Sequence, residues 1–176
     1  MKKKALLAFC LLTVAAFPRV TGRAQGMAHS GVAFLKPTQG SKVKGTVQFT
    51  EIPPKTHIVA DVTGLSPGKH GFHIHEKGDC GAPDASSAGG HFNPDNAKHG
   101  APDASEHHNG DLGNLEADAS GHAHYERTVD FLELAVDPKT IDGKAIIVHA
   151  GEDDLHSQPA GNSGARVACG IIRKKS

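Results

Sequence analysis

The sequence has little of what a helical bundle, a membrane-spanning protein or a nucleic-acid-binding protein requires. It contains no tryptophan, one tyrosine and only 38% hydrophobic residues, against 21 glycines and 10 prolines. This composition favours short elements joined by turns and argues against a bundle of long helices. Beyond the N-terminal segment, no apolar run approaches the roughly 20 residues that cross a bilayer as a helix. Basic and acidic residues are equal in number, at 19 each, and give no sign of a nucleic-acid partner.

The first two dozen residues have the features of an export signal. Three lysines at positions 2–4 precede an apolar run over residues 5–16, and Gly22-Arg-Ala24 offers small residues where a signal peptidase cuts. We predict cleavage after Ala24, with Gly26 as the alternative, and a single mature domain over residues 25–176. The mature chain would carry 14 basic and 19 acidic residues and would be exported, either to a periplasm or out of the cell.

Cysteine is scarce, with three residues in the chain. Loss of the predicted signal would remove Cys10 and leave Cys80 and Cys169. In an oxidising compartment two cysteines most simply form one disulfide, and two free thiols are the alternative. The disulfide would close a loop of about 90 residues, for which the chain-entropy model gives up to about 4–5 kcal/mol of stabilisation.

Short runs rich in β-branched residues, separated by turn residues, predict an all-β fold of about eight antiparallel strands. The predicted strands cover residues 32–35, 43–49, 56–62, 70–75, 112–117, 122–128, 145–148 and 165–172. Two stretches without periodicity, residues 76–111 and 149–164, predict two long loops, and loops of this length are usually functional. The Arg-Lys-Lys run near the C-terminus is interpreted as a solvated tail.

Histidine, in contrast, is abundant, and seven of the 13 histidines lie between residues 70 and 108. Neutral imidazole is the commonest protein ligand for zinc and copper, so this density predicts a metal site. In the predicted strand over residues 70–75, Phe72 and Ile74 face one way and His73 and His75 the other. Two imidazoles on one strand face, about 6–7 Å apart along the chain, can bind the same ion.

Several blocks, spread in order over the mature chain, resemble the copper,zinc superoxide dismutases, especially their exported bacterial branch. The blocks are Gly71-Phe-His-Ile-His75, Gly89-Gly-His-Phe-Asn-Pro94, Lys98-His-Gly100, Gly110-Asp-Leu-Gly-Asn114, Val148-His149 and Gly161-Asn-Ser-Gly-Ala-Arg-Val-Ala-Cys-Gly170. The resemblance implies a Greek-key β-sandwich or flattened barrel with one copper and one zinc per chain. It also implies that superoxide is disproportionated to dioxygen and hydrogen peroxide as copper cycles between Cu(II) and Cu(I).

The resemblance further implies two sets of metal ligands that share one histidine. Copper would be held by His73, His75, His91 and His149, and zinc by His91, His99, His108 and Asp111. Four nitrogens suit Cu(II), and three nitrogens with one carboxylate oxygen suit tetrahedral zinc. His107 is the alternative to His108, but in the family pattern the zinc ligand stands three residues before the aspartate.

Other residues receive roles from the same resemblance. Arg166 would attract superoxide to the copper, and Asp153 would link a copper histidine to a zinc histidine, with Asp154 as its alternative. His70 would hydrogen-bond within the scaffold. The remaining histidines have no motif around them and are predicted to lie at the surface; they are His29, His57, His122, His124 and His156.

Two other classes of function compete with dismutation. One is an exported protein that binds copper and zinc without turnover, and the other is a zinc-dependent hydrolase. Four protein ligands on zinc argue against hydrolysis, which needs an open coordination position. Dimer contacts differ between the branches of the resembled family, so a homodimer is left open.

Overall fold

The computed structural model describes residues 29–134 and 139–175, so the predicted signal peptide lies outside the described residues. Apart from the short 3-10 helix η1 (Ser86–Ala88), the regular elements of these residues are strands, which confirms the all-β prediction. The strands are β1 (Ser30–Pro37), β2 (Lys44–Ile52), β3 (Lys55–Thr63), β4 (Gly68–His75), β5 (Asp111–Ala117), β6 (Ala123–Val129), β7 (Ala145–His149), β8 (Arg166–Ile171) and β9 (Arg173–Lys175).

The strands pair antiparallel and form a nearly closed barrel. Hydrogen-bonded neighbours follow the order β5-β4-β7-β8-β1-β2-β3-β6. The end strands β5 and β6 contact each other across the remaining gap, where the Tyr125 hydroxyl donates a hydrogen bond to the Leu112 carbonyl at 3.0 Å. After β4, β5 and β6, strand β7 returns beside β4, which is the Greek-key arrangement predicted.

Strand β4 carries the alternation expected from the sequence. Phe72 and Ile74 are fully buried in the main core between the two sides of the barrel. His73 and His75 point to the opposite face, away from that core, and are also buried because the long loops cover them. The strand therefore stabilises the fold with one face and presents two imidazoles with the other.

The C-terminal strand differs from the prediction of one strand followed by a solvated tail. The segment breaks at Ile172, which is buried in the core, so that β8 and β9 are separate strands. β9 pairs with β1 through Ser30, Gly31 and Val32. The three basic side chains of β9 are exposed, as a tail would be, but their backbone continues the sheet.

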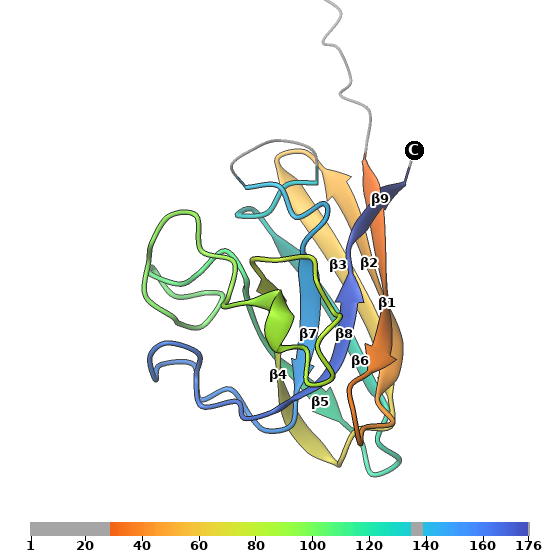
Figure 1. Ribbon diagram of the computed structural model, residues 1–176. Helices are drawn as coiled ribbons and strands as arrows, with labels where there is room; N and C mark the ends of the chain where they lie inside the picture. Colours follow the sequence, from red (N-terminus) through yellow and green to blue (C-terminus); the bar gives the residue numbers. More distant parts are fainter. Residues whose placement is uncertain (1–28, 135–138, 176) are drawn as a thin grey trace, which may run out of the picture.

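The long loops extend from the side of the barrel formed by β4, β7 and β8, and appear green and blue on the left of Figure 1. The predicted disulfide joins the first loop to β8 through Cys80 and Cys169. Around it Ala85, Ala88 and Ile147 form a second, smaller apolar cluster. The outer face of β7 and β8 is therefore covered by the loop that follows β4.

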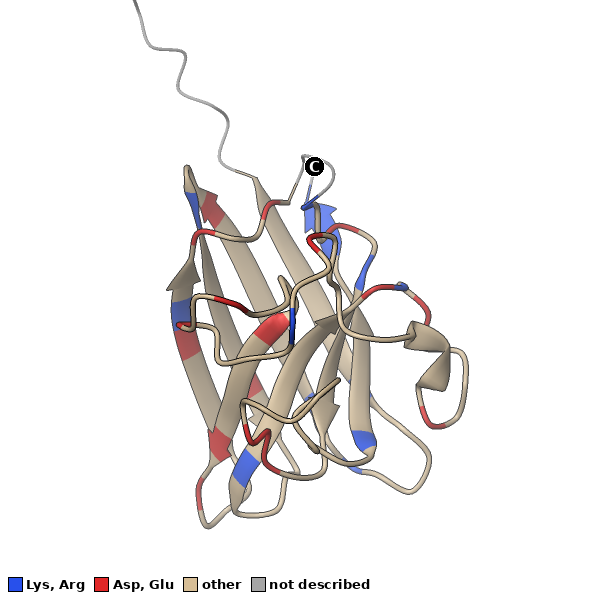
Figure 2. Cartoon of the chain, turned by 90° about the vertical axis from the view of Figure 1, so that its left-hand side faces the viewer, with Lys and Arg blue, Asp and Glu red and all other residues tan. Residues whose placement is uncertain are grey.

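Figure 2 shows the molecule from the side of these loops. Lysine, arginine, aspartate and glutamate are scattered over strands and loops, and the described residues form no continuous basic face in this view. Within residues 29–134 and 139–175, no helix is long and apolar enough to cross a membrane.

Candidate metal centre

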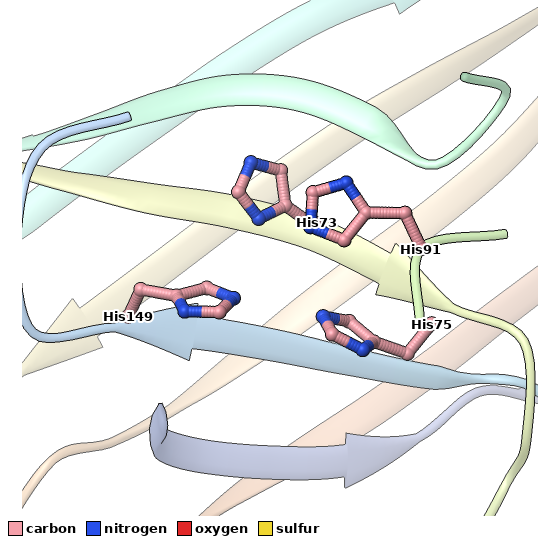
Figure 3. A group of neighbouring side chains, drawn as sticks. All are labelled: His73, His75, His91 and His149. Atoms are coloured by element: carbon pink, nitrogen blue, oxygen red, sulfur yellow. The ribbon is translucent and has the colours of Figure 1, made fainter. Parts of the chain in front are cut away.

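Two groups of buried ligand atoms lie beneath the loops and share His91. The first contains His73, His75, His91 and His149, and the second contains His91, His99, His108 and Asp111. Within each group the ligand atoms lie within 4.8 Å of one another. Figure 3 shows the first group, with rings from β4, from the loop that follows β4 and from the end of β7 turned toward one another. The residues proposed from sequence are thus brought together from four separate segments.

Local irregularities of the strands help to aim two of these rings. The register between β4 and β5 shifts between Gly71 and His73, and the register between β7 and β8 shifts between Val148 and His149. Such bulges are common beside functional sites, because one extra residue turns the next side chain out of the regular alternation. Here both bulges lie directly at members of the first group.

The unsatisfied polar atoms of the interior indicate that these residues are suited to bind cations. Among the described residues, every buried side-chain nitrogen or oxygen without a hydrogen-bond partner belongs to these two groups, namely His73 Nδ1, His75 Nε2, His91 Nε2, His99 Nδ1 and His149 Nε2. Leaving a buried polar atom unpaired costs roughly 1–3 kcal/mol, and native proteins rarely leave several together. Four of these nitrogens belong to the first group and suit Cu(II).

The second group has the dimensions of a tetrahedral zinc site. His91 Nδ1 and His99 Nδ1 lie 2.8 Å and 3.0 Å from Asp111 Oδ1, and His108 Nδ1 lies 3.3 Å from the same oxygen. Zinc bonds of about 2.0–2.1 Å in a tetrahedron hold the ligand atoms about 3.3 Å apart. The His99 nitrogen is close to the carboxylate but not aligned for a hydrogen bond, as expected when both atoms face a common ion.

The first group suits copper and is called the copper group below. In three of its four histidines the protein fixes the second ring nitrogen, while His91 turns both nitrogens to the ligand groups. His73 Nε2 lies 2.7 Å from Asp153 Oδ2, and His75 Nδ1 lies 2.9 Å from the Gly89 carbonyl oxygen. His149 Nδ1 lies 3.0 Å from the Gly164 carbonyl oxygen. Each contact fixes the ring orientation and leaves the other nitrogen free to bind a metal.

Asp153 connects the two groups. Its Oδ1 lies 2.9 Å from His99 Nε2 while its Oδ2 contacts His73. Asn114 holds the backbone of Asp153 through two hydrogen bonds, of 2.8 and 2.9 Å. Asp154 instead faces its own loop, where it binds the backbone of residues 156 and 157. The sequence blocks contained Asn114, but no role for it was predicted.

Burial keeps the copper-group imidazoles neutral. It lowers the pKa of His73 to about 3, of His75 to about 2 and of His149 to about 4. Neutral rings are the form that binds metals, since the ligating nitrogen needs its lone pair. At His99 burial also opposes the charge, but the neighbouring carboxylates of Asp111 and Asp153 raise its pKa to about 9. A cation bound at Nδ1 would take the place of that proton.

The neighbouring histidines at 107 and 108 take different positions. His108 is buried in the second group, whereas the ring of His107 stands against Phe131, with 4.5 Å between ring centroids. His70 lies in the scaffold, as predicted, with Nδ1 2.8 Å from the His149 carbonyl oxygen. The geometry thus favours His108 over His107 as a ligand.

Arg166 lies at the mouth of the first group. It lines a cavity of about 340 Å³ together with His75, His91 and His149. Its guanidinium donates hydrogen bonds to the carbonyl oxygens of Ala85 and Gly89. The Gly89 carbonyl also contacts His75 Nδ1, so one backbone oxygen positions both the arginine and a copper-group ring. Sequence alone gave no signal for this shared carbonyl.

Comparisons with known proteins agree with the geometry. Residues 43–172 match the family model described as copper/zinc superoxide dismutase (SODC). A Cu-Zn superoxide dismutase of Onchocerca volvulus is 42% identical over 159 residues, covering 83% of this chain and 96% of that protein. An extracellular Cu-Zn superoxide dismutase of Brugia pahangi is 40% identical over 152 residues, covering 81% and 75%.

A third relative carries a different name. The copper chaperone for superoxide dismutase of Homo sapiens is 40% identical over 141 residues, covering 76% of this chain and 50% of that protein. The match of the family model and the two dismutases extends over most of the chain. From the fold, the two buried ligand groups and these similarities, the chain belongs to the copper/zinc superoxide dismutase family.

Proposed function

We propose that the protein converts two superoxide anions and two protons to dioxygen and hydrogen peroxide at the shared centre. The observation that carries this proposal is the convergence of buried ligand atoms on two positions that share His91, with four unpartnered ring nitrogens at the first position and one at the second. The proposed copper ligands are His73 Nδ1, His75 Nε2, His91 Nε2 and His149 Nε2. The proposed zinc ligands are His91 Nδ1, His99 Nδ1, His108 Nδ1 and Asp111 Oδ1.

When bound, copper supplies one-electron chemistry between Cu(II) and Cu(I), and zinc supplies positive charge without redox chemistry. The residues supply position and protons. His91 lines the cavity, and its Nε2 has no hydrogen-bond partner within the protein. This atom is therefore the one at which a proton can be taken up and delivered to the reduced substrate. His91 Nδ1 lies 2.8 Å from Asp111 Oδ1, so both atoms face the proposed zinc position, which would keep the ring oriented when zinc is bound.

Arg166 is proposed to bring the substrate to the centre. Its guanidinium always carries a charge, and it lies beside His75 and His149 at the cavity. The mature chain has more acidic than basic residues, so a positive group at the cavity creates a local positive potential. This potential attracts an anionic substrate to the site. Because two carbonyls hold the guanidinium, it attracts superoxide from a fixed position.

Metal-dependent activity tests the proposal against metal delivery without turnover. We expect the protein loaded with copper and zinc to consume superoxide, and the form loaded with zinc alone to be inactive. Replacement His91→Ala should abolish turnover in protein that still binds copper. A loaded protein that holds both metals but leaves the superoxide decay unchanged would support delivery, the role named for the human relative.

We also propose that residues 1–24 are a signal peptide and that the chain belongs to the exported bacterial branch. The short interval from His75 to Cys80 supports the bacterial branch, and the oxidised Cys80–Cys169 pair supports export. The Brugia pahangi relative is named an extracellular enzyme, which agrees with export but does not separate a periplasm from the extracellular space. Sequencing of the mature N-terminus should give residue 25 or, for the alternative, residue 27.

A homodimer is proposed as the assembly. Phe34 on β1 is 64% exposed and borders a hollow of about 480 Å³ beside Cys80 and Cys169. An exposed phenyl ring beside a hollow gives a second copy of the chain apolar surface to bury. Sedimentation should show a dimer, and Phe34→Ser should shift the equilibrium toward the monomer. A wild-type monomer at all concentrations would contradict this proposal.

A further inference from the structure

A second group of histidines lies on the outside of the barrel, where β3 and β6 pair. Ile58, Ala60 and Val62 of β3 point into the core, so the residues between them face outward. The register places Asp61 opposite His124 of β6. His122 precedes β6 by one residue and stands two positions from His124. Residues two apart on extended backbone share a face, so both imidazoles lie beside Asp61.

Both imidazoles approach one carboxylate oxygen, although the ligand atoms of the three residues do not all lie within 4.8 Å of one another, so His122 must turn inward to share an ion. His124 Nδ1 lies 2.7 Å from Asp61 Oδ1, and His122 Nε2 lies 3.9 Å from the same oxygen. The side chains are 46% exposed for His122, 54% for His124 and 55% for Asp61, so they can adjust around a ligand. An ordinary ion pair would explain the shorter contact. It would not explain why a second imidazole is directed at the same oxygen.

The turn before β6 fixes the position of His122. Asp118 Oδ1 accepts hydrogen bonds from the backbone N–H of Ser120, at 2.8 Å, and of His122, at 3.0 Å. Gly121 has φ +77°, and a Cβ atom there would come within 2.3 Å of the Leu65 carbonyl oxygen. The backbone that carries His122 is therefore held in place before any ligand binds, which lowers the entropic cost of binding.

We propose that His122, His124 and Asp61 bind one borderline divalent cation, of the class of Zn(II), Cu(II) or Ni(II). Two imidazoles and one carboxylate favour such ions over calcium and magnesium, which prefer oxygen ligands. Water would complete the coordination, because the site is open to solvent. The site takes no member from β4, β7 or the long loops, so it is separate from the buried centre and does not depend on the function proposed for it.

Titration of the loaded protein with Ni(II) tests the proposal. The buried groups are first filled with copper and zinc, and Ni(II) is then added while bound metal is counted. We expect one additional ion per chain in wild-type protein. His124→Gln and His122→Gln should each weaken this binding at least about tenfold, a change of roughly 1.4 kcal/mol. His57→Gln is the matched control, since His57 is on the same surface but contacts Glu126 instead.

Nuclear magnetic resonance of the histidine rings gives a second readout that does not depend on variants. Paramagnetic Ni(II) should broaden the ring signals of His122 and His124 before those of the exposed His156. Equal affinity in wild type and both variants would overturn the proposal. So would broadening that begins at His156 or His29, or a loss of binding in His57→Gln equal to that in His124→Gln.

Discussion

At the residue scale, three histidines of the copper group are each held by one ring nitrogen and offer the other to a metal, whereas His91 offers both of its nitrogens. A carboxylate holds His73, and backbone carbonyls hold His75 and His149. The same burial that lowers the pKa of these rings also prevents water from satisfying the free nitrogens. The rings are therefore oriented for a metal ion before it binds. We expect loss of the contacts that hold the rings to lower metal affinity nearly as much as loss of the ligands themselves.

Asp153→Asn tests how much the contacts that hold the rings contribute to metal affinity. An amide cannot accept hydrogen bonds through both of its side-chain groups, so it loses one of the contacts to His73 Nε2 and His99 Nε2. We expect zinc and copper to be bound about 10–100-fold more weakly, as measured by competition with a chelator. Asp154→Asn is the control, because Asp154 contacts only its own loop in the described structure. Equal losses in the two variants would contradict the proposed link.

Arg166→Lys separates charge from position. Lysine keeps the charge but lacks the planar fork that donates to the Ala85 and Gly89 carbonyls. We expect kcat/KM for superoxide to fall by a factor of a few in Arg166→Lys and by about tenfold or more in Arg166→Ala. The rate of the alanine variant should also depend less on ionic strength. An unchanged rate in Arg166→Ala would show that the arginine does not guide the substrate.

At the scale of elements, the loop after β4 joins the disulfide, the arginine and the copper group. Cys80 attaches this loop to β8, and Ala85 and Gly89 accept hydrogen bonds from Arg166 of the same strand. Gly89 then contacts His75. These contacts follow one another over ten residues of the loop. Breaking the disulfide should therefore lower the stability of the fold and also disturb the positions of Arg166 and His75.

Replacement of both cysteines by serine releases the loop after β4 from β8. The bond closes a sequence separation of 89 residues, so its loss should lower the free energy of unfolding by up to about 4–5 kcal/mol. Urea denaturation of metal-free wild type and double variant measures this difference. We also expect kcat/KM to fall in the loaded variant, since the carbonyls that hold Arg166 are no longer fixed. Identical unfolding midpoints would exclude a stabilising role for the disulfide.

The elements also show which features could be predicted from sequence. The alternation of Phe72 and Ile74 with His73 and His75 correctly predicted which face carries the imidazoles, because strand geometry fixes this from local sequence. The disulfide followed from the small number of cysteines. Strand β9 was missed because three consecutive basic residues have no alternation, and only pairing with β1 makes them a strand.

Features that depend on distant backbone could not be predicted. The contacts of Gly89 and Gly164 with copper-group rings involve carbonyls, which every residue has. The approach of Asp61 to His122 and His124 requires the register between β3 and β6, which is set by the whole sheet. The surface position predicted for these two histidines is confirmed, but their shared carboxylate was not foreseen.

At the scale of the whole molecule, the long loops bury titratable groups against the barrel, and the charges of these groups depend on bound metal. In metal-free protein His73, His75 and His149 have pKa values lowered from 6.5 by burial. His99 has its pKa raised to about 9, since Asp111 and Asp153 outweigh the effect of burial. The two classes of histidine therefore give opposite slopes of stability with pH, in separate ranges.

We predict that metal-free protein is most stable near pH 6.5. Below that pH the unfolded chain protonates the four histidines whose pKa is lowered in the folded state, namely His73, His75, His91 and His149, while the folded chain does not. The free energy of unfolding therefore falls as pH falls. Each such histidine contributes about 1.4 kcal/mol per pH unit. The contribution of His99 is complete below 6.5 and is lost as pH rises through about 9. Urea midpoints from pH 4.5 to 9.5 measure both slopes, and a midpoint that rises from pH 6.5 to 5 would contradict the account.

The most direct test of the central claim is anomalous diffraction from crystals of the loaded protein, recorded at the copper and zinc absorption edges. The account predicts one copper among His73, His75, His91 and His149, and one zinc among His91, His99, His108 and Asp111. The ring of His91 should lie between the two ions. Two ions that do not share His91, or the same metal in both positions after loading with equal copper and zinc, would contradict it.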